Sequence, residues 1–181
     1  LVVPLQLQAT GALQNDQAVF DGRLTGAGGN INIHGNGAHN FTEKTGKITI
    51  KAKKITFLPS VLQPGALFPP LRHMFREVDG DIALNTALSW RDGNLQSSAE
   101  ALINLTRLKT DEVTIKNAAA ILHFNNLFPP TTTTGQTIDI GEIDIGVPLT
   151  DGRVLLHLRA DGSVLAGVEK FNFFGGRIET T

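Results

Sequence analysis

The chain has 181 residues, a formal net charge of −1 and no cysteine. The missing cysteines exclude disulfide bridges, cysteine-ligated zinc and thiol catalysis. The near-neutral charge argues against nucleic-acid binding or a polybasic membrane-surface role. No apolar run approaches the roughly 18 residues of a membrane-spanning helix. Because the chain begins at Leu1, inside strand-like sequence, we interpret it as a piece of a larger protein.

Alternating apolar residues predict strands from the start of the chain, in "LVVPLQLQATGAL", "QAVFDGRLTG" and "NINIHGNG". In "GKITIKAKKITFL" the apolar row runs through Ile48 and Ile50 and resumes at Ile55 and Phe57. The row changes parity at Lys53-Lys54, which is typical of a β-bulge.

A proline-rich segment then interrupts the alternation, with prolines at positions 59, 64, 69 and 70. Pro70 suits the first turn of a helix, and Leu71, Met74 and Phe75 follow at the spacing of one helical face. We therefore predict a short helix over residues 70–77, and a weak sub-repeat boundary near residues 58–78.

The clearest hairpin follows in residues 82–105. Ile82, Leu84, Leu88 and Trp90 point to one side of a strand, and the alternation resumes at Leu95 after the turn residues 91–94.

Further strands are predicted in "TIDIGEIDIGV", where the row changes parity at Gly141-Glu142, and then in "RVLLHL" and "VLAGVEKFNFF". In total, the patterns predict about nine or ten strands. We expect an all-β fold over residues 1–181 as one elongated domain, a long, curved and mostly antiparallel sheet with one or two short helices. The sheet would form a hydrophobic groove or an open barrel or sandwich. Its apolar face has to be covered by a second sheet, by a helix, or by something that is not protein.

The tetrapeptide "LFPP" occurs twice, at residues 67–70 and 127–130. Each copy is followed, about twenty residues later, by an Asp-Gly turn, so a weak internal repeat and chance in a low-diversity sequence both remain open. We expect Phe68 and Phe128 to be buried and both proline pairs to lie outside the sheet, because proline donates no ladder hydrogen bond. Such an excursion could cap one end of a groove.

No residue pattern supports catalysis. The chain lacks a Gly-x-Ser-x-Gly elbow, and the aspartates at positions 21, 79, 92, 151 and 161 are predicted to lie at turns, where they serve the backbone. The five histidines lack metal-ligand spacing, and His34 and His39, which flank a glycine loop, are better explained as turn residues. We expect neither a metal, a cofactor nor enzymatic activity.

The second half, about residues 88–181, resembles the YdbH-type proteins of the bacterial envelope, which belong to the AsmA-like group that includes TamB relatives and carry the older label "dicarboxylate transport" domain. The resemblance rests on a proline loop, the run "GQTIDIGEIDIGVPLTDGRV" and the closing "FFGGR". A dicarboxylate site would need converging Arg or Lys side chains, which the pattern does not indicate.

The resemblance implies a non-enzymatic segment of a periplasmic, envelope-spanning protein whose parent chain is anchored in the inner membrane. Its apolar β-groove would bind phospholipid, or another apolar ligand, and conduct acyl chains between the two membranes. The implied partners are the remaining segments of the parent chain and a protein on the outer-membrane side, and nucleic acid is not among them.

The apolar strand positions predict which side chains would line such a groove, with ordinary protein core as the competing explanation for each. The predicted lining residues are Ile82, Leu84, Leu88, Trp90, Leu95, Ile103, Ile115, Ile121, Ile138, Ile140, Ile143, Ile145, Leu156, Leu158, Phe171 and Phe173. The alternative function is a structural or interaction scaffold, solenoid-like and without ligand, whose strand edges pair with neighbouring segments.

Overall fold

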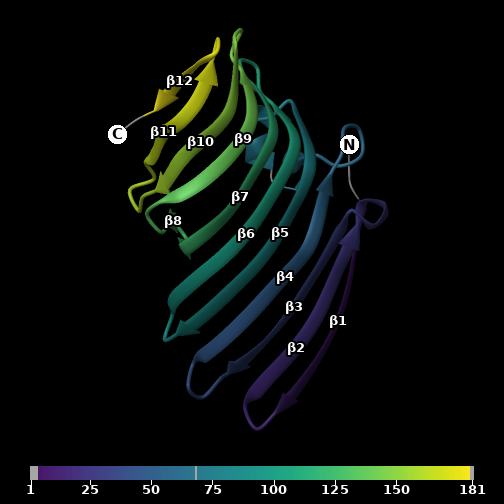
Figure 1. Ribbon diagram of the computed structural model, residues 1–181. Helices are drawn as coiled ribbons and strands as arrows, with labels where there is room; N and C mark the ends of the chain where they lie inside the picture. Colours follow the sequence, from purple (N-terminus) through teal and green to yellow (C-terminus); the bar gives the residue numbers. More distant parts are fainter. Residues whose placement is uncertain (1–3, 68, 180–181) are drawn as a thin grey trace.

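A single open sheet makes up most of the molecule (Figure 1). The computed structural model describes residues 4–67 and 69–179. The strands are β1 (Leu5–Gln14), β2 (Gln17–Gly26), β3 (Ile31–Asn40), β4 (Thr45–Phe57), β5 (Glu77–Arg91), β6 (Asn94–Lys109), β7 (Thr114–Leu127), β8 (Pro130–Thr132), β9 (Gln136–Asp144), β10 (Pro148–Leu158), β11 (Val164–Phe173) and β12 (Gly176–Glu179). The prediction of a long, antiparallel all-β sheet is confirmed, and the described residues form 12 strands instead of the predicted nine or ten.

The strands pair with their neighbours in chain order, all antiparallel, from β1 to β12. The short strand β8 lies off this path and pairs with the end of β7. The buried hydroxyl of Thr132 on β8 accepts a hydrogen bond from the Leu158 amide of β10, at 3.0 Å. β8 therefore bridges β7 and β10 beyond the start of β9.

Tight turns set the register of the hairpins. The predicted hairpin of residues 82–105 is present as β5 and β6, with Trp90 opposite Leu95. Its turn residues Asp92 and Gly93 both have positive φ, at 48° and 82°, as the two-residue hairpin turns that match the strand twist require. The predicted bulge at Lys53-Lys54 is confirmed, because the register with β5 shifts between Ala52 and Ile55.

β7 and β9 each have a backbone irregularity, and the two lie side by side in the sheet. Asn117 of β7 has φ 53° and lies beside Gly141 of β9, where an added Cβ would be 3.0 Å from the Asn117 Cβ. Ile140 and Ile143, on either side of Gly141, pair with Ala118 and Ile115. The predicted change of parity at Gly141-Glu142 therefore occurs in both strands together, so their mutual register is preserved.

The segment between β4 and β5, residues 58–76, is called the capping segment below. It contains α1 (Pro64–Leu67) and the 3₁₀ helix η2 (Pro69–His73), and β5 already begins at Glu77. The short helix predicted near residues 70–77 is present as η2, but it is a 3₁₀ helix and ends at His73. Phe68, which we expected to be buried, lies outside the described residues.

The second "LFPP" copy forms the turn from β7 to β8. Pro130 is the first residue of β8 and pairs with Leu127, so the expectation that this proline pair lies outside the sheet was wrong for Pro130. Phe128 was expected to be buried but is 68% exposed, because it sits at the tip of the turn.

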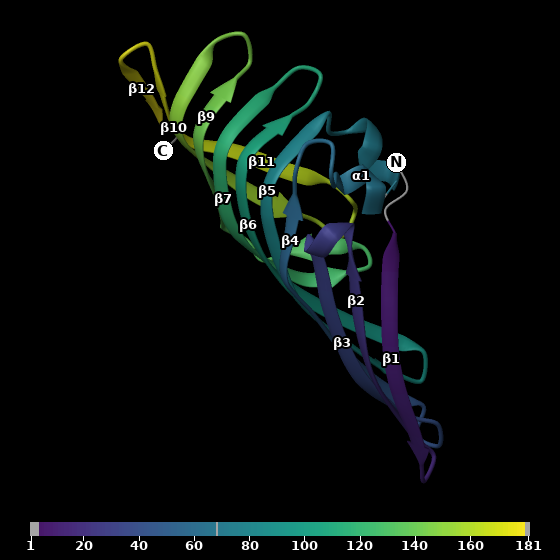
Figure 2. The same ribbon diagram turned by 90° about the vertical axis from the view of Figure 1, so that its right-hand side faces the viewer.

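The sheet is curved, and one face lies on the inside of the curve. Figure 2 shows α1 on this inner side. Phe171 of β11 belongs to one buried cluster with Ala118 of β7, although β9 and β10 lie between them in the sheet. On β6, the small side chains of Ala99 and Ala101 are buried while Leu102, on the opposite face, is exposed. Side chains converge on the concave side of a sheet, so these residues mark the inner face.

Candidate functional site: the inner face of the sheet

Apolar side chains continue across the inner face from strand to strand. Two overlapping rows of register partners show this. The first runs over β1 to β7 through Leu7, Leu24, Ile33, Ala52, Leu84, Ala101 and Leu122. The second runs over β4 to β11 through Ile55, Ile82, Ile103, Ala120, Ile138, Val154 and Val168.

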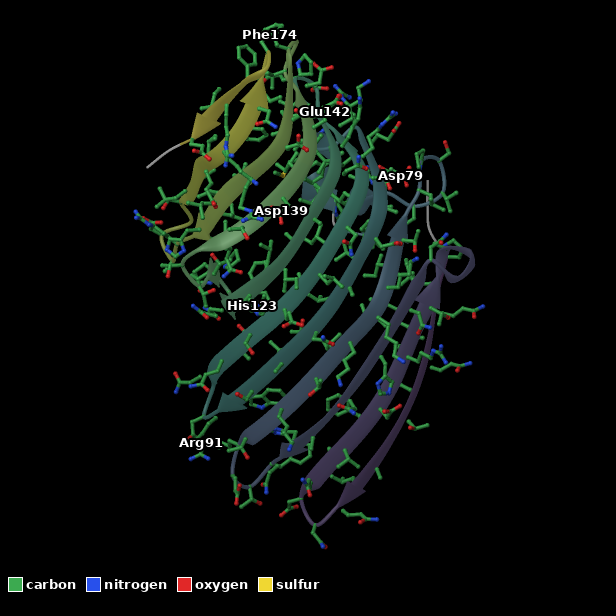
Figure 3. The ribbon with its side chains drawn as sticks, in the orientation of Figure 1. Asp79, Arg91, His123, Asp139, Glu142 and Phe174 are labelled. Carbon is green, nitrogen blue, oxygen red and sulfur yellow. The ribbon has the colours of Figure 1, made fainter. Side chains whose placement is uncertain are left out.

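Charged side chains are confined to the other face of the described strands. By register, no Asp, Glu, Lys or Arg of β1 to β12 shares the face of the two apolar rows. The outer face carries the ion pairs Lys116–Glu142 and Arg153–Asp139. Asp79, His123, Asp139 and Glu142, all on this outer face, are labelled in Figure 3. The sheet therefore separates an uncharged surface from a charged one.

Glycines let large rings lie flat on the inner face. A Cβ added at Gly152 would be 1.9 Å from the Phe171 ring, and one added at Gly46 would be 2.1 Å from the Trp90 ring. The Trp90 indole also donates a hydrogen bond from Nε1 to His39 Nδ1, at 3.1 Å. The rings therefore add apolar area while projecting little from the sheet.

Polar groups on the inner face are satisfied locally. The buried Ser97 hydroxyl donates to Asn126 Oδ1 at 2.6 Å and accepts from the Leu127 amide at 2.9 Å. The buried Gln136 accepts a hydrogen bond at Oε1 from the His123 amide, at 2.8 Å. Among the described residues, no buried side-chain nitrogen or oxygen lacks a partner. These groups fasten β6, β7 and β9 to each other and leave the inner face electrically neutral.

Most of the predicted lining residues share the inner face, and two do not. Ile121 pairs with Leu102 on the outer face and is 54% exposed. Its neighbour Leu122 takes the inner position and is buried opposite Ala101. Ile145 follows the end of β9 and is 56% exposed. The register places the others on the inner face, namely Ile82, Leu84, Leu88, Trp90, Leu95, Ile103, Ile115, Ile138, Ile140, Ile143, Leu156, Leu158, Phe171 and Phe173.

The first half of the chain contributes to the same face, which the predicted lining did not include. β1 to β4 supply Leu7, Leu24, Ile33 and Ile50, among others. The alternation in these strands was visible, but it is diluted by glycines such as Gly22 and Gly35 that occupy inner positions.

The capping segment covers one end of the inner face over β3 to β6. Its Leu62 is 1% exposed and packs with Ile31, Phe57 and Val78 in one buried cluster. The Gln63 amide holds the segment in place, since Nε2 donates to the carbonyls of Leu58, Leu62 and Val78 and Oε1 accepts from the Val78 amide, at 2.7 to 3.1 Å.

Two shallow depressions, of about 750 and 610 Å³, lie over the opposite, outer face. Both are bordered by Lys47, Ser89 and Gln96, which are register neighbours on that face. Their lining mixes polar and small side chains without a cluster of catalytic type. Within residues 4–67 and 69–179, no three His, Asp or Glu side chains gather closely enough to hold a metal ion.

Three aspartates have a lowered pKa, each for a local reason; Asp81 is half-buried, and Asp111 and Asp161 are exposed. Hydrogen bonds from Thr56 and Lys54 lower the pKa of Asp81, and the hydrogen-bonded Arg76 lowers the pKa of Asp111. The Ser163 hydroxyl and amide lower the pKa of Asp161 in the turn before β11. Asp81 links β5 to β4, whereas Asp111 and Asp161 lie in connections between strands.

Comparison with known proteins identifies the family. No curated protein and no solved structure matches the chain. Among the described residues, no helix has the length and hydropathy needed to cross a membrane. The model of the YdbH-like family, described as intermembrane phospholipid transport protein YdbH, matches residues 3–181. The match includes the first half of the chain, in which the sequence alone showed no clear motif. Because it covers almost the full length, the chain belongs to the YdbH-like family of intermembrane phospholipid transport proteins.

Proposed function

We propose that the inner face binds phospholipid acyl chains and lets them pass along the sheet between the inner and outer membranes, without catalysis. The observation that carries this proposal is the uncharged apolar surface that continues from β1 to β11. Each methylene that leaves water for such a surface contributes about 0.8 kcal/mol. The family description supports a phospholipid as the ligand.

The length of the inner face suits this role. The rows cross ten strands, and neighbouring strands lie about 4.8 Å apart, so the path is about 43 Å long along the curve. One leaflet of a bilayer has a hydrocarbon layer of about 15 Å, half of the ~30 Å core. The inner face is therefore longer than one acyl chain, which suits passage better than a single closed binding site.

The parent protein, in this proposal, is anchored in the inner membrane and works in the periplasm with its remaining segments and an outer-membrane-side partner. Residues 1–181 act as one elongated β domain within it. Exposed apolar surface of this extent is uncommon unless it binds something.

Native mass spectrometry of the protein purified from cells tests the proposal. We expect phospholipid to co-purify, and Leu84→Asp to reduce its occupancy about tenfold or more, because an unpaired carboxylate in an apolar site costs well over the ~1.4 kcal/mol that corresponds to tenfold. Leu102→Asp is the matched control, since Leu102 lies on β6 next to Ala101, the partner of Leu84, but on the outer face. Circular dichroism of both variants checks that the sheet is retained.

A ligand-free scaffold is the alternative, and the open edges of β1 and β12 at the two ends of the sheet favour it. A clean apo mass for the unchanged protein, or equal lipid loss in Leu84→Asp and Leu102→Asp, would support the scaffold and overturn the lipid proposal. Turnover of ester, glycoside or phosphate substrates would overturn the non-enzymatic part.

A further inference from the structure

The capping segment has a second surface that the packing of the sheet does not use. One side of the segment is buried against the inner face through Leu62. The segment also exposes four large apolar side chains, Leu58, Val61, Leu67 and Met74, with Met74 57% exposed. An anchored segment with this many exposed apolar groups is a candidate contact surface.

The same segment is the basic part of the inner side. Residues 58–76 contain Arg72, His73 and Arg76 and no acidic residue, in a chain whose net charge is −1. Arg76 is bound by Asp111, with Nη2 donating to Oδ2 at 3.1 Å. Arg72 is exposed, and none of the described acidic residues forms an ion pair with it. The segment therefore has one guanidinium without an ion-pair partner among the described residues, as well as exposed apolar side chains.

The position of Arg72 is set by the packing of α1 against η2. Gly65 of α1 is buried, and a Cβ there would lie 2.7 Å from the Cα of Arg72. The Gln63 hydrogen bonds to Val78 fasten the same segment to β5. The backbone of Arg72 is thus packed against α1, and the side chain extends from this anchored backbone.

These observations point to a phosphate contact. The strand residues of the inner face carry no Lys or Arg, so that face offers nothing to the phosphate of a lipid whose acyl chains lie on it. The capping segment lies on the same inner side (Figure 2) and has both a cation and exposed apolar side chains. Apolar side chains beside a basic residue suit the boundary between acyl chains and an anionic headgroup.

We infer that the capping segment is a headgroup subsite, in which Arg72 binds the phosphate of a phospholipid and the exposed apolar side chains contact the upper part of its acyl chains. This inference rests on the proposed function and adds a selectivity to it. A lipid that has a phosphate should be retained over a lipid that has the same acyl chains without one.

A competition experiment tests the inference. The protein is offered equal amounts of phosphatidylglycerol and diacylglycerol with identical acyl chains, and native mass spectrometry gives the ratio of the two bound lipids. We expect Arg72→Gln to lower this ratio about two- to fivefold, the range of one solvent-exposed ion pair. Arg91→Gln is the matched control, because Arg91 is also exposed but lies at the opposite end of β5 from the capping segment. Its ratio should stay unchanged.

Two further measurements follow. The first distinguishes a lipid contact from a general anion site, and the second distinguishes the effect of the charge of Arg72 from the effect of its position. Addition of inorganic phosphate, compared with chloride at the same ionic strength, should leave the ratio of the two bound lipids unchanged. If phosphate but not chloride removes the preference for phosphatidylglycerol, the site binds the free anion and the inference is overturned.

Gly65→Ala keeps the charge of Arg72 but displaces its backbone, so this variant should also lower the ratio. If the preference is fully retained, the position of Arg72 does not matter.

The failures of the two proposals are distinguishable. If the unchanged protein binds neither lipid, the proposed function fails and the subsite fails with it. If both lipids bind but Arg72→Gln leaves their ratio unchanged, or Arg91→Gln lowers it equally, only the subsite is overturned.

Discussion

Gly152 is predicted to be a position where a single methyl group destabilises the sheet. Gly152 lies on the inner face of β10, opposite Ile140, and the Phe171 ring covers it. An added Cβ would be 1.9 Å from Cε1 of this ring, which is itself 3% exposed and packs with Ala118 and Ile140. The ring has to move out of its cluster, and overpacking of this kind costs about 1–3 kcal/mol.

The assay is urea unfolding of Gly152→Ala, followed by the fluorescence of Trp90, the single tryptophan, and by circular dichroism. Gly167→Ala is the matched control, since Gly167 is also a strand glycine but its nearest side-chain neighbour, the Leu155 Cβ, would be 3.9 Å away. That variant should be neutral or slightly stabilising. The double variant Gly152→Ala with Phe171→Leu should lose about 1 kcal/mol less than the sum of the two single losses. A Gly152→Ala protein within about 0.5 kcal/mol of the unchanged one would refute the reasoning.

Two other predictions concern the capping segment and the outer face. Gln63→Leu should lower the free energy of unfolding by about 1–3 kcal/mol, because the Val78 amide and carbonyl lose their hydrogen-bond partner. Hydrogen exchange at the Leu58 and Leu62 amides should become faster, and unchanged exchange there would contradict the role of Gln63 as an anchor. The pKa of Asp81 is lowered in the folded state, so its contribution to stability is present above the ordinary Asp value of about 4 and is lost as the pH falls through the lower folded-state value. The urea midpoint of Asp81→Asn should therefore drop less between about pH 6 and pH 3 than that of the unchanged protein. An equal drop in the two proteins would contradict this.

The sheet could be predicted from the sequence because a period of two is a local signal. Alternation marked the β5–β6 hairpin, and the pair Lys53-Lys54 marked the bulge, since two adjacent charged residues interrupt an apolar row that resumes with the other parity. These features depend only on neighbouring residues. They did not require knowledge of which strand pairs with which.

The exact membership of the inner face was less predictable where both faces are apolar. In the run from Asn117 to Phe124, alanines and aliphatic residues occupy both parities, so alternation does not choose between Ile121 and Leu122. Asn117 also adopts a positive φ, which changes parity without an inserted residue. Only the pairing with β6, in which Leu122 lies opposite Ala101, shows that Leu122 and not Ile121 is on the inner face.

The two "LFPP" copies show how context decides the outcome of one motif. In the first copy, Leu67 ends α1 and Pro69 begins η2. In the second, the Asn126 amide donates to the Phe128 carbonyl at 3.0 Å, and the chain reverses into β8. Phe128 is left at the tip of the turn, away from any apolar surface. The prolines predict a change of direction in both places, but burial depends on distant residues.

Two glycines under aromatic rings shape the inner face. An acyl chain that moves along a sheet needs apolar area without tall side chains in its path, and a ring that stands upright would block it. Gly46 and Gly152 allow the rings of Trp90 and Phe171 to lie over backbone instead. A side chain at either glycine would lift the ring toward the path that we propose for the acyl chains. Gly152→Ala should therefore reduce lipid occupancy as well as stability, and Phe171→Leu in the same chain should restore occupancy, because the shorter side chain leaves the path free.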